Sequence, residues 1–527
     1  MKGVKHLDVS ETQLAELRGK LDRQELAPAD FEQLKSVIDT VLYLADRYRK
    51  ATSSMKRVLK MIFGASTEKT AHVLGQKPEK EAPPKPKRKR KGHGRRAADE
   101  YPGAENIHVP HESLRPGQDC PDCQKGVIGD TQRPSVLIRL CAQPLVKATA
   151  YVIEKLRCSL CGKLFSATTP EAALEKYDPN VAPMLATARY GYGLPMSRLA
   201  AMQAAFGVPL PTGTQWELIQ VLYNEVGPVV WAEMLRQAAK GGVVYNDDTN
   251  GRVLELEQTI REQKAKQGDK IRTGVFTTGI VSVGEAEKIA LYFTGRQHAG
   301  ENLQDVLAQR PGDLPPPIQM CDGLNRNEPE CHTIEGNCTV HGRREFVEIS
   351  DHFPAECAYV LETVKSVYKH EAHTVEQNMS PEQRLRYHQQ ESGPLFEKMK
   401  LWMEEQSRNK LVEPNGELGK AIKYVLKRWD KLTLFLRKAG APLDNNICER
   451  ILKTPIRHRD NSLFYKTVNG AKVGDFFMGV IQTCRMTGKD PFHYLTTIRR
   501  YAQKLRENPS AWMPWNYLAT VAGLPAP

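Results

Sequence analysis

The chain has 527 residues, more than one hydrophobic core usually organises, so several domains are expected. Its 75 Lys and Arg residues outnumber 62 Asp and Glu, and the formal charge of +13 favours a polyanionic partner, nucleic acid ahead of an anionic membrane surface. No run of eighteen or more apolar residues occurs, and the first residues lack the apolar stretch of a signal peptide. We therefore expect a soluble cytoplasmic protein, nucleoid-associated when bound to DNA.

Residues 1–76 are predicted to form a helical segment with a coiled coil. Apolar residues alternate at spacings of three and four from Phe31, Leu34 and Ile38 through to Ile62, over more than four heptads without Pro or Gly. This pattern is typical of a leucine-zipper-like coiled coil and predicts self-association. A long helix packed on its own domain is the alternative.

Residues 77–100 are predicted to be a basic linker. Lys and Pro dominate the stretch, which cannot bury a core. We expect an extended chain that lies along DNA phosphates, and a plain solvated tether is the alternative. The expected DNA contacts are Lys87, Arg88, Lys89, Arg90, Arg95 and Arg96.

Residues 101–170 are predicted to form a zinc-binding module like a zinc ribbon. Two CxxC pairs, Cys120 with Cys123 and Cys158 with Cys161, can each point two thiolates at one ion. Four sulfurs complete a closed tetrahedral shell, which indicates structural Zn²⁺. A redox dithiol is the alternative, and disulfides are a minor one in a chain with eleven cysteines.

Residues 171–240 are predicted to form a small helical domain. Three short helices are expected over residues 183–190, 197–206 and 212–222, separated by segments that contain Gly and Pro. This spacing suits a helix-turn-helix whose second helix enters a major groove, although any small helical bundle has the same pattern.

Residues 241–350 change to strand patterns. We expect strands over 243–246, 252–257, 272–283 and 289–294, a helix over 301–309, and strands over 318–321 and 332–340. Residues 343–438 are helical almost throughout, and 351–440 are interpreted as an insertion. Strands interleaved with helices predict a mixed α/β core.

Three carboxylates are candidate metal ligands. Asp247 and Asp322 each end an apolar strand, so both can project at one sheet edge if those strands are neighbours. Glu449 follows a predicted helix cap at Asp444 or Asn445 by about one turn. Phosphodiester cleavage and transfer use two Mg²⁺ ions held by carboxylates from separate elements. An Asp at a strand end is also a common turn residue, so the pattern alone is not specific.

Cys338 and His341 form a second metal candidate, with Cys331 and His332 nearby in the sequence. A buried cysteine and a histidine at the start of a helix is the interpretation we favour, because ligands spaced from a strand end into a helix are not expected to converge.

The chain resembles the transposases of the insertion sequence 66 type. The matching segments follow the family's order over almost the whole chain: VLKMIFGASTEK, GHGRR, CPDC, CSLC, YGYGLPMSRL, NDDT, CTVHGRREF, RWDKLTLFL, DNNICER, TGKDPFHYL and AWMPW. The resemblance implies a ribonuclease H-like catalytic domain in two parts, 241–350 and 441–485, followed by a C-terminal segment, 486–527. It places the catalytic Asp, Asp and Glu of a DDE triad on Asp247, Asp322 and Glu449.

The resemblance also bears on neighbouring residues. Arg450 would lie beside the metal site, suited to a phosphate. Cys338 and His341 match a CxxH-like signature, which favours a scaffolding role, with local packing as the alternative. The family usually has Glu where Asp248 stands, and strand alternation sends the side chains of Asp247 and Asp248 to opposite faces, so Asp247 is assigned as the ligand. Leu324 and residues 325–327 stand where the family tends to place Tyr, and the usual Arg-Lys pair is altered at 459–460.

The implied function is that of a DDE transposase of a bacterial insertion sequence. With Mg²⁺ or Mn²⁺ it would cleave the element's ends by attack of water and join the freed 3′-hydroxyl to target DNA. A homo-oligomer built through the coiled coil would pair two ends, and accessory proteins of the same element are expected partners. The alternatives are a non-catalytic DNA-binding protein derived from a transposase and a nuclease without joining activity.

Overall fold

The computed structural model describes two compact units, Met1–Glu79 and Lys80–Pro527. Among the described residues, no helix is long and apolar enough to cross a membrane. The described residues are 11–23, 25–38, 70–73, 113–119, 121, 125–127, 145–157, 164–267, 271–285, 287–409 and 411–524.

The first unit contains α1 (Glu11–Asp22), a helical stretch over residues 28–38, and α3 (Thr70–Val73). Lys20 Nζ pairs with Asp30 Oδ1 at 3.1 Å and links the first two helices. Two residues of the predicted heptad seam, Phe31 and Ile38, are 58% and 51% exposed. The seam beyond Ile38 lies outside the described residues, as does the basic linker.

The second unit is built on a five-stranded mixed sheet, which confirms the expected mixed α/β class. The strand order is β5-β4-β3-β6-β7, with β3–β4 and β4–β5 antiparallel and β3–β6 and β6–β7 parallel. The strands are β3 (Val243–Asn250), β4 (Phe276–Val283), β5 (Lys288–Gly295), β6 (Ile318–Cys321) and β7 (Ile334–Asn337).

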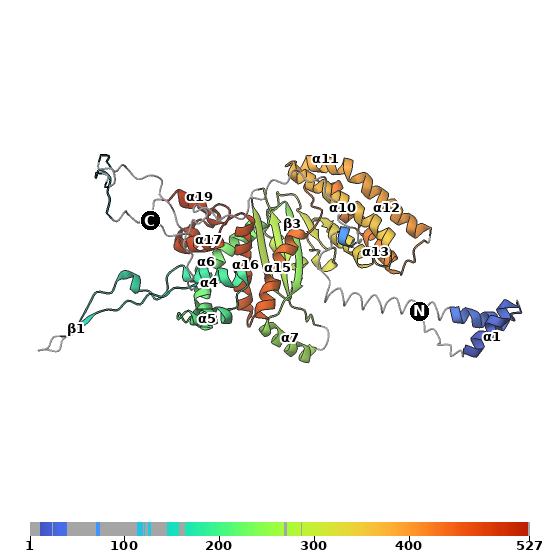
Figure 1. Ribbon diagram of the computed structural model, residues 1–527, viewed down its shortest axis with the longest axis horizontal. Helices are drawn as coiled ribbons and strands as arrows, with labels where there is room; N and C mark the ends of the chain where they lie inside the picture. The colour runs from blue at the N-terminus through green and yellow to red at the C-terminus, as the bar shows by residue number, and fades with distance from the viewer. Residues whose placement is uncertain are drawn as a thin grey trace. The chain divides into compact units, whose positions relative to one another are not determined.

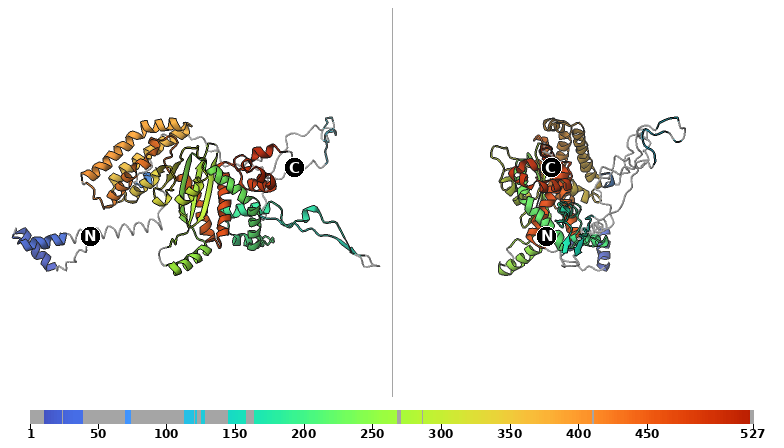
Figure 2. Two further views of the ribbon diagram at one scale, coloured as in Figure 1. Left: turned by 180° about the vertical axis from the view of Figure 1, so that it is seen from behind. Right: turned by 90° about the vertical axis from the view of Figure 1, so that its left-hand side faces the viewer.

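Helices cover both faces of this sheet. Adjacent residues of β4 show this, because Thr278 accepts a hydrogen bond from Asn302 of α8 (Ala299–Leu307), whereas Gly279 lies against Leu452 of α15 (Asn446–Ser462). Successive strand residues point to opposite faces, so α8 and α15 lie on opposite sides. In Figures 1 and 2, α15 and α16 (Val468–Met486) are the orange-red helices that lie along the green strands.

A helical layer shares one hydrophobic core with β3, β4 and β5. Its longest member is α6, whose buried residues include Leu222, Val226 and Val230. The helices are α4 (Val181–Ala186), a π-helical turn η3 (Thr187–Gly191), α5 (Met196–Ala205), α6 (Thr212–Ala238), α16, α17 (Pro491–Arg500), α18 (Ala502–Glu507) and α19 (Tyr517–Ala522).

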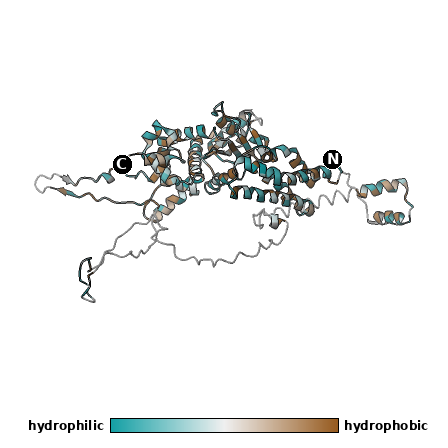
Figure 3. Cartoon of the chain, turned by 90° about the horizontal axis from the view of Figure 1, so that it is seen from above, coloured by the Kyte–Doolittle hydropathy of each residue, from teal (hydrophilic) through white to brown (hydrophobic). Residues whose placement is uncertain are grey.

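A second group of helices follows β7. Hydrophobic and hydrophilic residues alternate along these ribbons, as expected for helices that bury one face (Figure 3). The helices are α9 (Thr339–Glu348), α10 (Pro354–Glu376), α11 (Pro381–Glu391), α12 (Gly393–Arg408), α13 (Glu417–Lys427) and α14 (Trp429–Leu432).

The interior of these helices holds a polar cluster, which we call the Glu371 cluster. Glu371 Oε2 lies 2.8 Å from both Arg384 Nε and His388 Nε2, and His388 Nδ1 lies 2.9 Å from Ser392 Oγ. Burial opposes ionisation of Glu371, but the hydrogen bonds from His388 and Arg384 outweigh it, and the pKa of Glu371 is lowered.

A small separate sheet pairs β1 (Lys155–Arg157) with β2 (Leu164–Ser166). These strands flank the second CxxC pair in the sequence. Cys158 and Cys161, like Cys120 and Cys123, lie outside the described residues.

Two of the predicted elements are wrong. The strand expected over 252–257 is largely helix, α7 (Leu254–Gln267), because the apparent alternation LELE opens a run of Glu, Gln and Lys, which favour helix. The third short helix, expected over 212–222, is the first part of the 27-residue helix α6. Pro228 lies inside α6 without ending it.

Candidate active site

Asp247 and Asp322 lie on neighbouring parallel strands. Asp322 directly follows β6, as expected, whereas Asp247 lies within β3, which continues through Asn250 rather than ending at Asp247. β3 and β6 pair from Val243 opposite Ile318 to Tyr245 opposite Met320. Continued by two residues along each strand, the same register places Asp247 opposite Asp322. Strand alternation directs both side chains to the same face of the sheet.

Glu449 lies in the first turn of α15. Asn445 is the N-cap residue, and the Asp444 side chain accepts the N–H of Asn446 at 3.0 Å, so the predicted helix start is confirmed. Asn445 Nδ2 donates to the backbone oxygen of Asn246 at 3.2 Å. This bond ties the start of α15 to the residue before Asp247.

Gly279 allows α15 to approach the sheet at this point. Gly279 pairs with Asp247 across β3 and β4. A Cβ atom at position 279 would lie 2.9 Å from Leu452 Cδ2, closer than side chains tolerate without a shift. Cys448 Sγ donates to the Gly279 oxygen at 3.2 Å, and the Tyr292 hydroxyl donates to the oxygen of Ile451 at 2.8 Å. The helix that carries Glu449 is therefore fixed over Asp247.

The three carboxylates interact electrostatically. Burial is the largest cause that raises the pKa of Asp247. Together with the negative charges of Asp322, Asp248 and Glu449, and against the lowering effect of the Asp248 N–H, it brings this pKa from 3.8 to about 7. That N–H donates to Asp247 Oδ1 at 2.8 Å. Like charges that crowd a buried carboxyl disfavour its ionised form unless a cation joins them.

Asp248 points to the opposite face of β3. Its side chain is only 1% exposed, and its two oxygens lie 3.2 Å from His298 Nδ1 and 3.2 Å from Arg326 Nη2. His298 is the N-cap residue of α8, and Arg326 lies in a short 3₁₀ turn, η5 (Asn325–Asn327). The Asp248 carboxylate is thus already paired with two side chains, whereas Asp247 accepts the backbone N–H of Asp248.

The loop after Asp322 is held from two sides. Asp322 Oδ1 accepts from Asn327 Nδ2 at 2.6 Å and from the Leu324 N–H at 3.1 Å. Gly323 adopts a φ of 77°, which favours glycine. Tyr424 and Arg428, from α13 and its C-terminal end, donate to the backbone oxygens of Asp322 and Gly323 at 3.3 and 3.4 Å.

These supporting residues were not foreseen from the sequence. Tyr424 and Arg428 lie about a hundred positions from the loop they contact, and His298 lies 50 positions from Asp248. Nothing in a local pattern links residues so far apart, because only the folded topology brings them together.

Cys338 and His341 approach Glu449. The ligand atoms of these three residues all lie within 4.8 Å of one another, and His341 Nδ1 is 3.9 Å from Glu449 Oε1. The expectation that Cys338 and His341 do not converge is therefore wrong, although Cys338 is buried and His341 does lie in the first turn of α9. The CxxH spacing was the available signal, because three residues from a helix cap return to the same side of the helix.

Arg450 is exposed and lines a cavity of about 340 Å³ between α15 and α16. Lys288 and Arg485 also line this cavity and add positive charge. The other predicted DNA contacts, from Lys87 to Arg96, lie outside the described residues.

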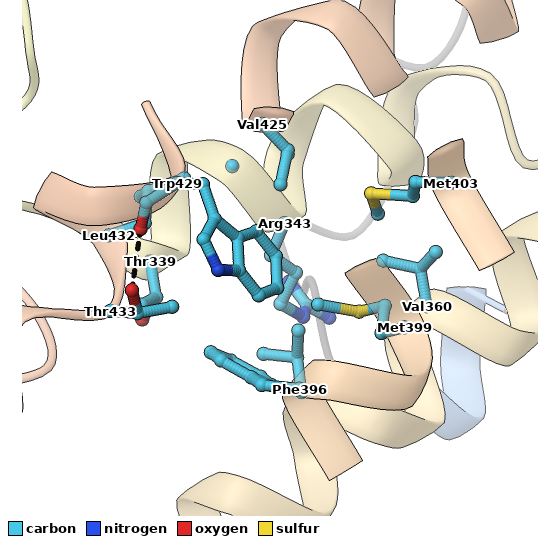
Figure 4. A pocket seen from close by; sticks show the side chains of 12 residues that line it. Thr339, Arg343, Val360, Phe396, Met399, Met403, Val425, Trp429, Leu432 and Thr433 are labelled. Atoms are coloured by element: carbon cyan, nitrogen blue, oxygen red, sulfur yellow. Dashed lines mark hydrogen bonds between the residues drawn. The ribbon is translucent and has the colours of Figure 1, made fainter. Parts of the chain in front are cut away.

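A second cavity lies among the helices α9 to α14. Figure 4 shows Trp429, Phe396, Met399 and Val425 directed toward a common space. Its volume is about 20 Å³, room for about one water molecule, and its lining is mostly apolar. It is therefore a small packing space rather than a nucleotide site.

Asp247 in β3, Asp322 after β6 and Glu449 at the start of α15 are residues whose chemistry fits a divalent cation. Asp247 carries the charge crowding described above, and Glu449 Oε1 is a buried oxygen without a hydrogen-bond partner. Carboxylate oxygens are the ligands that Mg²⁺ prefers.

Comparison with known proteins gives the family. Residues 176–473 match the profile of the family described as "Transposase IS66 family". The chain therefore belongs to the Transposase IS66 family. Membership implies, in general terms, an enzyme that cuts and joins nucleic acid and so binds DNA.

Curated relatives occur in Sinorhizobium fredii. The uncharacterized protein y4jD is 23% identical over 95% of this chain and 99% of its own length. The uncharacterized protein y4hP is 27% identical over 67% of this chain, and the matched part covers only 64% of the y4hP length. A third, y4qI, is 34% identical over 24% of this chain and 23% of its own length.

Proposed function

We propose that this protein is a DDE transposase of a bacterial insertion sequence, which binds the element's ends and catalyses metal-dependent DNA cleavage and strand transfer. The observation that supports the proposal is the raised pKa of Asp247, to which burial contributes most and to which the charges of Asp322 and Glu449, from two other elements, also contribute.

In this proposal Asp247, Asp322 and Glu449 hold divalent cations. Two Mg²⁺ or Mn²⁺ ions, when bound, would supply the positive charge that stabilises the attacking and leaving oxygens of a phosphodiester. The protein's own contribution is to fix the three carboxylates and to orient the DNA strands, and Arg450 offers a guanidinium to a nearby phosphate.

The proposed catalytic domain is ribonuclease H-like, in parts 241–350 and 441–485, with 351–440 as a helical insertion. The strand order β5-β4-β3-β6-β7, with three antiparallel strands followed by two parallel ones, supports this assignment. The contacts of Tyr424 and Arg428 with the Asp322 loop give the insertion a supporting role at the site.

The remaining segments are proposed to bind DNA and a second copy of the chain. Exposure of Phe31 and Ile38 supports self-association through the first unit, because paired helices would bury such a seam. We further propose structural Zn²⁺ on the four CxxC cysteines, phosphate contacts by the basic linker, a C-terminal segment over 486–527, and accessory proteins from the same element.

The test uses a labelled duplex that carries the element's end, with a target duplex and Mg²⁺ or Mn²⁺. Wild type is expected to yield both cut and joined products. Asp322→Asn and Glu449→Gln are expected to bind the duplex and to cut at least about a thousandfold more slowly, since loss of metal-held charge costs several kcal/mol of transition-state stabilisation. Cutting without joining would indicate a nuclease, and binding without cutting, even with the element's other proteins supplied, would indicate a DNA-binding protein.

A further inference from the structure

Cys338, His341 and Glu449 bring three different ligand types together beside the proposed active site. Cys338 is the N-cap residue of α9, His341 lies in the first turn of that helix, and Glu449 comes from the first turn of α15. Their sulfur, nitrogen and oxygen atoms lie within 4.8 Å of one another. The cluster therefore joins two helices that are a hundred residues apart in the chain.

Several backbone N–H groups point to the Cys338 sulfur. Its Sγ accepts the N–H of Asn445 at 3.3 Å, and the backbone N–H groups of His341 and Val340 also point to it. Burial raises the pKa of the Cys338 thiol to about 12, and these N–H groups act against that rise. Several N–H groups directed at one sulfur stabilise negative charge there, as metal-bound thiolates require.

Two buried polar atoms of the cluster are left without partners. His341 Nδ1 and Glu449 Oε1 are both inaccessible to solvent and make no hydrogen bond, and they face each other across 3.9 Å. That separation is too long for a direct hydrogen bond. Leaving two such atoms without partners is unfavourable, so a ligand between them would be stabilising.

We propose that Cys338, His341 and Glu449 form a transition-metal site that binds Zn²⁺. Zinc takes sulfur at about 2.3 Å, imidazole nitrogen at about 2.0–2.1 Å and carboxylate oxygen at about 2.0–2.2 Å, so shifts of about 1 Å would bring the three atoms onto one ion. Three protein ligands leave a fourth position for water. The mixed ligand set selects against Mg²⁺, which takes oxygen ligands.

The site shares Glu449 with the proposed magnesium centre. This consequence rests on the proposed function, in which the Glu449 carboxylate holds the catalytic cations. A zinc ion that draws this carboxylate toward Cys338 and His341 removes it from Asp247 and Asp322. Zinc therefore inhibits magnesium-supported cleavage, and the inhibition depends on Cys338 and His341.

Zinc binding is tested first, on the full chain and without DNA. Zinc per chain is measured after desalting, by competition with a chromophoric chelator, for wild type, Cys338→Ser and His341→Gln. Wild type should hold one zinc more than either variant, or bind that zinc at least about tenfold more tightly, since even indirect partners of a metal contribute about 10–100-fold. Because the CxxC pairs are present in all of these proteins, their zinc cancels when the zinc content of a variant is subtracted from that of wild type.

The matched controls are Cys331→Ser and His332→Gln, the neighbouring cysteine and histidine outside the cluster. These should bind zinc as wild type does. Added Co²⁺ should give a near-ultraviolet thiolate band that is weaker in Cys338→Ser than in wild type and unchanged in Cys331→Ser, since the CxxC pairs contribute equally to all of these spectra. Circular dichroism and the melting temperature establish that each variant is folded. Equal zinc content and equal Co²⁺ spectra in wild type and folded Cys338→Ser would overturn the proposal.

Inhibition is then measured as cleavage in Mg²⁺ with increasing Zn²⁺, each variant relative to its own zinc-free rate. The expected result is a zinc concentration for half-inhibition at least about tenfold higher in Cys338→Ser and His341→Gln than in wild type. Identical inhibition curves would overturn the shared role of Glu449. Zinc binding without any cleavage activity would leave the metal site standing and refute the proposed function, so the two failures are distinguishable.

Discussion

Two clusters built around a carboxylate differ in how their charge is balanced. In the Glu371 cluster, Arg384 and His388 contact the carboxylate, and the pKa of Glu371 is lowered despite its burial. On β3, beside Asp322, burial and acidic neighbours raise the pKa of Asp247 to about 7. A cluster that supplies its own cations stabilises the fold, whereas one that concentrates negative charge calls for a cation from solution.

The largest effect is expected from the metal-dependent stability of the Asp247 cluster. In the folded state the pKa of Asp247 is raised from 3.8 to about 7. The folded protein is therefore favoured most below pH 4, and it loses stability as the pH rises from 4 through 7 and Asp247 must ionise. Without metal, Asp247→Asn should therefore raise the free energy of unfolding at pH 8 by up to about 4 kcal/mol. Chemical denaturation from pH 4 to pH 8 measures this difference.

Mg²⁺ should stabilise wild type and not Asp247→Asn. At about 100 times its dissociation constant, a ligand that binds only the folded state adds about 2.7 kcal/mol. Burial also raises the pKa of Asp475 to about 7, against its hydrogen bonds from Thr294, so both proteins keep that pH trend and the difference between them isolates Asp247. Equal Mg²⁺ effects in the two proteins would remove Asp247 from the metal site.

A smaller effect, without any metal dependence, is expected in the Glu371 cluster. Glu371→Gln leaves Arg384 and His388 without their carboxylate and should lower the free energy of unfolding by about 2–3 kcal/mol, less than for a fully buried pair because Glu371 is 26% exposed. Since the pKa of Glu371 is lowered, the advantage of wild type should vanish in acid. A Mg²⁺-dependent change in this variant would erase the contrast between the two clusters.

The smallest stability effect is expected at Gly279. The added methyl of Gly279→Ala would press on Leu452 and displace α15, at a cost of about 1 kcal/mol, and should slow cleavage by about tenfold because Glu449 moves with the helix. Gly295→Ala is the matched control, since a Cβ at position 295 meets no atom within 4 Å. Equal cleavage rates in the two variants would show that the approach of α15 does not set the geometry of the site.

The sequence predicted the parts of this site that local patterns encode. The apolar runs before Asp247 and Asp322 predicted β3 and β6, and Asp444 with Asn445 predicted the start of α15. The expectation that Asp248 faces away from Asp247 followed from strand alternation, and the contacts of Asp248 with His298 and Arg326 agree with it. The metal assignments themselves stay predictions.

Other features depend on the tertiary structure. The LELE pattern at residues 254–257 predicted a strand, but helix-favouring residues beyond it extend α7. The approach of Cys338 and His341 to Glu449 depends on α9 and α15 meeting in space, and the contact of Arg428 with the Asp322 loop depends on how α13 packs. No pattern within one element contains that information.

The most direct test of the central claim compares adjacent carboxylates on the two faces of β3. Cleavage of the labelled element end in Mg²⁺ is measured for Asp247→Asn and Asp248→Asn, per folded molecule. The proposed site predicts a loss of at least about a thousandfold for Asp247→Asn and a rate within about tenfold of wild type for Asp248→Asn. Equal losses in both variants, or the larger loss in Asp248→Asn, would contradict the assignment of Asp247 as a metal ligand.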